Sequence, residues 1–164
     1  MARIRNVSLC GLSVLLCTFV TSFAQAAAPD TTPTASQVSP SAAEITQLAQ
    51  QHVNERLGYW QQRLKLGDWR ISVSPARRSE LKPNTLGAIH WDKSKKTATI
   101  WVLDAADYQL PFRGMLDDLE VTIVHELIHL ELTSLPRGEA SRASEEHAVN
   151  GIADALLTLD RGKQ

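Results

Sequence analysis

The sequence predicts an α+β domain in which helices cover one face of a small sheet. Apolar residues recur at helical spacing after the N-terminal region and again in the last third of the chain. Between them, apolar and polar residues alternate as they do in half-buried strands. The resulting order of one helix, three strands and two helices favours an α+β architecture with helices packed on a sheet face.

The first 26 residues have the pattern of a secretory signal peptide. Arg3 and Arg5 precede an apolar run at 7–20, and small residues lead to a cleavage position expected after Ala26, with Ala28 as the alternative. The apolar run is too short to span a bilayer comfortably. We therefore expect a periplasmic or secreted protein without stable membrane insertion after cleavage.

Composition limits the chemistry of the rest of the chain. Both cysteines, Cys10 and Cys17, lie in the expected signal peptide, so neither a disulfide nor a thiolate ligand is expected after it. A metal site there must use imidazole and carboxylate groups. Without residues 1–26, 15 basic residues face 18 acidic ones, and this balance argues against nucleic-acid binding through charge.

After the expected signal peptide, the sequence predicts a flexible tether followed by a helix. Residues 27–40 are rich in Ala, Pro, Thr and Ser and predict a disordered linker before a domain at 41–164. The motif Ser41-Ala-Ala-Glu44 matches a capping box, which marks the start of a helix. Apolar residues then recur at helical spacing as far as Leu64, and Gly67-Asp68 predicts the end of the helix.

Three strand-like runs follow. The run from Trp69 to Val73 alternates apolar and polar residues until Pro75 breaks the pattern. The segments "LGAIHW" (86–91) and "TATIWVL" (97–103) flank the polar turn "DKSKK" and predict a hairpin. We expect these runs to form a meander, that is, an antiparallel sheet with one covered face.

Two helices complete the domain. Residues 115–132 carry apolar side chains at helical spacing and predict a largely buried helix. A loop at 133–142 separates this helix from a last one at about 143–159. Val149 and Ala153 mark the inward face of the last helix.

A candidate metal site lies in the stretch "VTIVHELIHLEL" of the buried helix. His125 and His129 are four residues apart, so both imidazoles can reach one ion at about 2.0–2.1 Å. In this His-Glu-x-x-His arrangement, zinc acidifies a water and polarises the scissile carbonyl while Glu126 accepts the water's proton. Buried, hydrogen-bonded histidines are the alternative, but three ionisable groups on an aliphatic helix would each need a partner.

A catalytic zinc ion usually takes a third protein ligand and keeps one position for water. Glu146 lies three residues before Val149, on the inward face of the last helix, and is the expected ligand. Glu145 is the first alternative, and His147 is another. Asn150, four residues after Glu146, can hydrogen-bond a side chain that binds the metal or a partner of such a side chain.

Peptide hydrolysis also needs a donor that stabilises the oxyanion, across the cleft from the base. Tyr108 and His147 are the preferred candidates in this sequence. His90 and Arg142 are the other two options.

These motifs together resemble a known family. His125-Glu126-Leu-Ile-His129, followed by a helix with Glu146-x-x-x-Asn150, is similar to the gluzincin branch of the zincin metallopeptidases. The string "EHAVNGIADALL" is especially similar to the corresponding helix of compact ImmA/IrrE-type peptidases. A secretory signal departs from those intracellular regulators, and the interval between His129 and Glu146 is shorter than in thermolysin-like enzymes.

The resemblance implies a minimal zincin-like fold with an N-terminal helix, a small antiparallel or mixed twisted sheet, an active-site helix and a C-terminal helix that carries the third ligand. It also implies that His125, His129 and Glu146 bind Zn²⁺ and that Glu126 acts as general base.

The sequence therefore predicts an exported zinc metallopeptidase that hydrolyses a peptide or protein substrate. In such folds the substrate lies extended along a sheet edge near the metal, and the strand from Thr97 to Leu103 is the expected edge. One alternative keeps the zinc and acts on cell-wall peptides as an amidase or endopeptidase. The other is a non-catalytic zinc-binding domain that contacts a partner through the tether.

Overall fold

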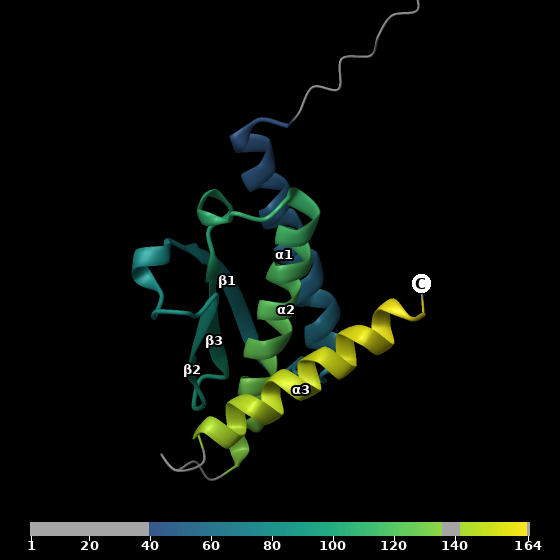
Figure 1. The fold of residues 1–164 in the computed structure, drawn as a ribbon. Coiled ribbons are helices and arrows are strands. Elements are labelled where there is room, and N and C mark those ends of the chain that lie inside the picture. Colours follow the sequence, from purple (N-terminus) through teal and green to yellow (C-terminus); the bar gives the residue numbers. More distant parts are fainter. Residues whose placement is uncertain (1–39, 136–141, 164) are drawn as a thin grey trace, which may run out of the picture. The chain divides into compact units, whose positions relative to one another are not determined.

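The computed structural model describes residues 40–135 and 142–163 and has the predicted α+β architecture (Figure 1). The order is α1, β1, β2, β3, α2 and α3, with short 3₁₀ turns between some of them. The expected signal peptide at 1–26 and nearly all of the expected linker at 27–40 lie outside the described residues. Among the described residues, no helix combines the length and apolar composition that crossing a bilayer requires.

Helix α1 spans Ala42–Arg63 and begins at the predicted capping box. The Ser41 hydroxyl accepts a hydrogen bond from the backbone N–H of Glu44 at 3.3 Å, and the Glu44 carboxylate accepts one from the backbone N–H of Ser41 at 2.7 Å. The helix ends a few residues before the predicted stop at Gly67-Asp68, because Lys65 turns the chain in a left-handed conformation with φ 57°. Its buried residues are Ala49, Val53, Leu57 and Trp60.

The sheet is mixed, with strand order β1-β3-β2. Strands β2 (Gly87–Asp92) and β3 (Thr97–Leu103) form the predicted antiparallel hairpin. Strand β1 (Arg70–Ala76) pairs with β3 in parallel. The expected all-antiparallel meander is therefore wrong at one pairing, and β3, not β2, is the central strand.

The loop between β1 and β2 explains this order. It carries the chain across the end of β3, so that β2 runs back on the far side and β3 starts at the same end as β1. Asp107, in the 3₁₀ turn Ala105–Asp107 just after β3, holds the loop there. Its carboxylate accepts hydrogen bonds from the Arg77 side chain at 2.6 Å and from the backbone N–H of Arg78 at 2.8 Å.

Pro75 does not end β1, contrary to the sequence prediction. The strand continues to Ala76, and Pro75 lies opposite Val102 of β3. Because β1 is an edge strand, the N–H group that proline lacks need not be part of the sheet's hydrogen-bond ladder.

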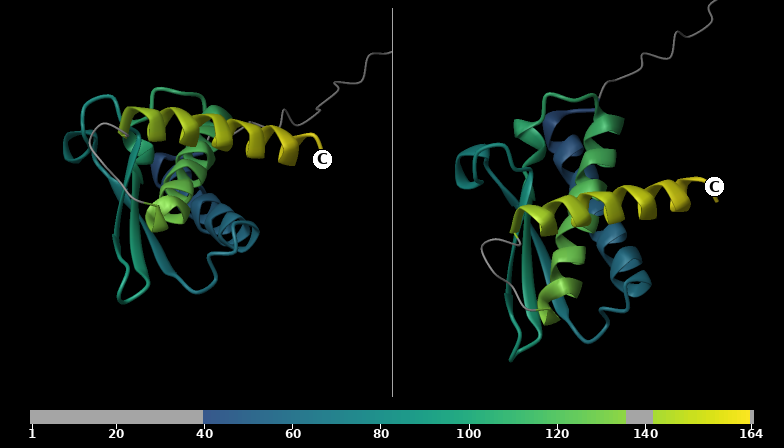
Figure 2. Two further views of the ribbon diagram at one scale, coloured as in Figure 1. Left: turned by 90° about the horizontal axis from the view of Figure 1, so that it is seen from below. Right: turned by 60° about the horizontal axis from the view of Figure 1, so that its bottom comes forward.

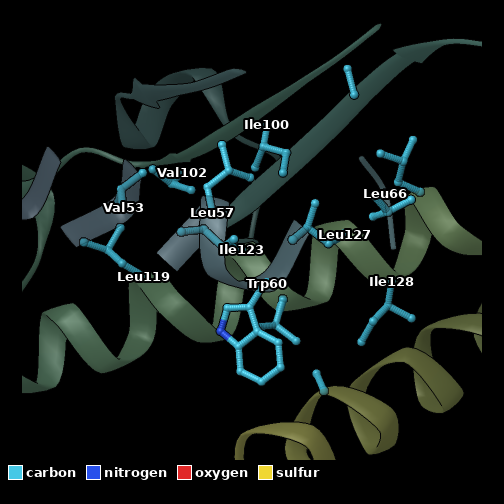
Figure 3. Packing of buried hydrophobic residues seen from close by; sticks show 14 of the residues in the cluster. Val53, Leu57, Trp60, Leu66, Ile100, Val102, Leu119, Ile123, Leu127 and Ile128 are labelled. Carbon is cyan, nitrogen blue, oxygen red and sulfur yellow. The ribbon is translucent and has the colours of Figure 1, made fainter. Parts of the chain in front are cut away.

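Helices α1 and α2 cover one face of the sheet (Figures 1 and 2). Helix α2 spans Phe112–Glu131, three residues earlier at its start than predicted, and Pro111 precedes it as N-cap. Figure 3 shows Ile100 of β3 facing Ile123 of α2 within this layer. The other labelled members of the core there are Val53, Leu57, Trp60, Leu66, Val102, Leu119, Leu127 and Ile128.

Helix α3 (Arg142–Arg161) crosses α2 and is held near its C-terminal end by a buried polar network (Figure 2). Asp160 accepts hydrogen bonds from the hydroxyl of Tyr59 and, at 3.2 Å, from the guanidinium of Arg56. Arg56 also pairs with Glu120 of α2, whose carboxylate accepts a 2.7 Å hydrogen bond from the indole of Trp60. The network joins all three helices.

Replacing Asp160 by asparagine should destabilise the protein more at neutral than at acid pH. The hydrogen bond from Tyr59, aided by Arg56 and Arg63, holds the pKa of Asp160 below its ordinary value of 3.8, although burial opposes this effect. Folding thus favours the charged form, so the carboxylate's stabilisation is present above pH 3.8 and lost as the pH falls through the lower folded pKa.

Urea denaturation followed by circular dichroism at pH 7 and below pH about 3 checks this expectation. The exposed Asp154→Asn variant on the same helix is the matched control. A difference between wild type and Asp160→Asn that stays the same at both pH values would contradict it.

Candidate metal centre

Two histidines face each other one helical turn apart on α2. The Nε2 atoms of His125 and His129 lie 3.0 Å apart. The surrounding helix is anchored in the core, since Val124, Leu127 and Ile128 are buried. The backbone that carries the two imidazoles is therefore rigidly positioned.

Glu146 of α3 brings a carboxylate to the same point. Its Oε2 lies 3.4 Å from Nε2 of His125, and its Oε1 lies 3.4 Å from Nε2 of His129. Val149 and Ala153, three and seven residues further along α3, are buried, and Glu146 on the same side of the helix is exposed but reaches the histidines. The three ligand atoms all lie within 4.8 Å of one another.

The other ring nitrogens have oxygen partners. Nδ1 of His125 lies 3.1 Å from the Asn150 side-chain oxygen, and Nδ1 of His129 lies 3.0 Å from a Glu145 carboxylate oxygen. Donation by both Nδ1–H groups is the usual support for histidines that bind a metal through Nε2. Glu145, weighed above as a third ligand, thus contacts the outward nitrogen of His129, while Asn150 takes the supporting position expected for it.

The geometry fits a small divalent cation. With both Nδ1 atoms protonated, two Nε2 lone pairs face each other beside a carboxylate, an arrangement that needs a cation or a proton between them. Atoms that each lie about 2.0–2.1 Å from a tetrahedral zinc ion are about 3.3 Å from one another. The separations of 3.0 and 3.4 Å agree with that value.

Electrostatics also favour metal binding by neutral imidazole. Burial lowers the pKa of His125, and the neighbouring His129 lowers it further, whereas Glu146 and Asn150 raise it. The net effect keeps His125 in the neutral form, which is the form that coordinates a metal.

Glu126 lies beside this cluster but points toward the sheet. Its carboxylate is buried, and a Cβ added to Gly87 of β2 would lie 3.2 Å from its Oε1. Burial raises the pKa of Glu126 to about 7, Glu146 raises it too, and His129 acts in the opposite direction. Within the described part of the chain, no side chain or backbone group hydrogen-bonds this carboxylate, which leaves it available to a bound molecule.

A groove of about 810 Å³ opens over these residues. One wall is β2 and the loop before it, and the other is formed by α2 and α3. The lining includes the two histidines, Glu126, Glu145, Glu146 and Asn150, together with Lys82, Gly87, Ile89, Trp91, Thr122 and Arg142. The candidate ligands, the candidate base and an edge strand therefore share one opening.

The preferred oxyanion stabilisers do not line the groove. The hydroxyl of Tyr108 donates a 2.8 Å hydrogen bond to Asp118, and burial raises the pKa of Tyr108 well above its ordinary value. His147 and His90 are exposed and are not among the residues that line the groove. Of the four residues considered from sequence, Arg142 alone lines it.

Sequence reasoning missed the contribution of β2 and its preceding loop. Gly87 is the one local signal, because a glycine inside a strand pattern often marks a close approach of another element. Helix α2 approaches most closely, because a Cβ on Gly87 would lie 2.4 Å from Cγ2 of Thr122. The neighbouring strand β3 is also near, with the backbone oxygen of Trp101 at 2.9 Å from that Cβ.

Replacing Gly87 by alanine should therefore push α2 away from the sheet and cost about 1–3 kcal/mol of unfolding free energy. Adding Thr122→Ser should recover part of the loss, because serine lacks Cγ2. Gly58→Ala in α1, where a Cβ would meet nothing within 4 Å, is the control and should stabilise slightly. Urea denaturation measures all three, and a Gly87→Ala variant as stable as wild type would refute the close approach.

Zinc should bind with a stoichiometry of one per chain and depend on the three clustered side chains. His129→Ala and Glu146→Ala should abolish binding. Glu145→Ala should keep the zinc with an affinity roughly 10- to 100-fold weaker, because Glu145 supports His129 rather than the ion. Elemental mass spectrometry and competition with a chelator measure content and affinity, with exposed His147→Ala as control. Absence of zinc from folded wild type after reconstitution would rule out the site.

Comparisons with known proteins do not identify a family for this chain. Searches against protein-family models, curated proteins and solved structures found no match. What the site binds and does is therefore inferred from the positions of its own side chains.

Proposed function

We propose that this protein is an exported zinc-dependent metallopeptidase. The observation that carries the proposal is that the Nε2 atoms of two histidines and a carboxylate lie 3.0–3.4 Å from one another. The Nδ1 atom of each histidine also has an oxygen within hydrogen-bonding distance. His125, His129 and Glu146 would hold the zinc. The donor set of two imidazoles and one carboxylate is that of several catalytic zinc sites.

When bound, the zinc supplies Lewis acidity, which lowers the pKa of a water molecule and polarises a carbonyl oxygen. Glu126 would serve as the general base. Its buried carboxylate, with a pKa raised to about 7, can accept the proton of the attacking water and return it to the leaving amine nitrogen. No nearby hydrogen bond within the described residues competes for its oxygens.

The substrate would lie along β2, which corrects the expectation that the strand from Thr97 to Leu103 forms the edge. That strand is β3 and lies in the centre of the sheet, whereas β2 is an edge strand that lines the groove. An edge strand can hydrogen-bond an extended peptide through its outward backbone groups. Gly87 and Ile89 would then lie beside the peptide, and Gly87 would lie next to Glu126.

Export to the periplasm or the outside is part of the proposal and rests on the residue pattern at 1–26. An amidase acting on cell-wall peptides would use the same side chains and differ in its substrate alone. Comparing cleavage of cell-wall peptides with cleavage of an unfolded protein separates the two. A non-catalytic zinc-binding domain would need no Glu126.

Glu126→Gln should reduce peptide hydrolysis by roughly 100-fold or more, because the amide cannot accept the water's proton. Zinc content should stay at the wild-type value, since Glu126 is not one of the three clustered side chains. The matched control is Glu131→Gln, which changes an exposed carboxylate on the same helix. Retained hydrolysis in Glu126→Gln, or no hydrolysis by zinc-loaded wild type, would overturn the proposed function.

A further inference from the structure

Two cations line the groove and form no ion pair with any residue that the structure describes. Lys82 lies in the loop before β2, and Arg142 is the first residue of α3. Both side chains are exposed, and neither makes a salt bridge or side-chain hydrogen bond in the described part of the chain. By contrast, Arg77 and Arg56, which lie elsewhere, are paired with carboxylates.

Two of the three carboxylates among the described residues of the groove lie against the histidines. Glu146 faces both imidazoles, and Glu145 contacts Nδ1 of His129. Glu126 is buried at the base of the groove. Arg142 is four residues before Glu146, the spacing of a helical ion pair, and yet the two form none. Among the described residues that line the groove, Lys82 and Arg142 are therefore the exposed charged side chains that no other side chain pairs.

The loop geometry holds Lys82 at one end of the groove. Its backbone oxygen accepts hydrogen bonds from the backbone N–H of Thr85 at 3.2 Å and from the Thr85 hydroxyl at 2.9 Å. Asn84 takes the left-handed conformation of this turn with φ 61°. Gly87, a short distance further along the chain, faces Thr122 and Glu126 of α2.

Arg142 lies toward the other end. Where α3 crosses α2, Asn150 contacts His125 and Glu145 contacts His129, so the earlier residue of α3 meets the later residue of α2. Arg142 is three residues before Glu145 and therefore lies on the His129 side of the pair. The C-terminal end of β2 also lies there, since Lys93 just after the strand hydrogen-bonds the backbone oxygen of Thr133. The two cations thus flank the histidine pair along the groove.

We infer that the substrates are peptides that carry acidic residues on both sides of the cleaved bond. One acidic residue would pair with Lys82 and the other with Arg142. This inference rests on the proposed function and names its substrate class. A guanidinium and an ammonium group at the two ends of one groove match two carboxylates spaced along an extended chain. Because both contacts are exposed, each should change affinity about twofold to fivefold at low ionic strength.

Binding to the zinc-loaded Glu126→Gln protein tests the inference apart from catalysis. Three fluorescent peptides of one length are titrated by anisotropy: one with glutamates flanking a central apolar pair, one with glutamines and one with lysines at the same positions. The glutamate peptide should bind about tenfold more tightly than the glutamine peptide, with the two contacts combined. The preference should shrink as salt is added.

Charge reversal gives the decisive comparison. Lys82→Glu and Arg142→Glu should each lower affinity for the glutamate peptide and raise it for the lysine peptide, which loss of folding would not do. Lys65→Glu makes the same change in net charge away from the groove and should alter neither. Equal binding of the three peptides, no binding at all, or a preference unchanged by both reversals would overturn the inference.

Cleavage by wild type separates this inference from the proposed function. Equal cleavage of the glutamate and glutamine peptides would overturn the selectivity for acidic peptides and would still support the proposed peptidase function. Selective binding of the glutamate peptide with no cleavage of any peptide would support the groove's selectivity and overturn the peptidase.

Discussion

The near-complete burial of the second half of α2 is the constraint on which the candidate site depends. Every residue from Thr122 to Leu130 except His125 is buried, because the sheet, α1 and α3 all pack against this helix. Polar groups in such a segment are costly unless they meet a partner or an opening. The histidines contact side chains of α3, and Glu126 lines the groove beside β2. The candidate ligands and the candidate base therefore face different neighbours from one helix.

Helix α3 supplies the rest of the cluster, and it is held to the other helices at more than one point. Val149 and Ala153 pack into the core close to the histidines. Asp160, near the other end, joins the charged network of Arg56 and Tyr59 on α1. A helix fixed over this length cannot easily rotate. The side chains that meet the histidines are therefore determined by packing as much as by their own chemistry.

The order of the strands has a direct consequence for the groove. In a meander with β2 in the centre, both edges of β2 would be paired, and a peptide could not add to it. With β3 in the centre, β2 is an edge strand of the described sheet, and Gly87 lets α2 approach it closely. The ten residues that cross the end of β3 thus decide which strand faces the candidate metal site.

Features that depend on residues a few positions apart could be predicted from the sequence: the capping box at Ser41, the hairpin, and two histidines on one helix face. The central position of β3, the nitrogen that Glu145 contacts, and the pairing of Tyr108 with Asp118 outside the groove became visible only in the folded chain. These arrangements depend on how whole elements pack, and packing between distant segments leaves no short-range spacing in the sequence.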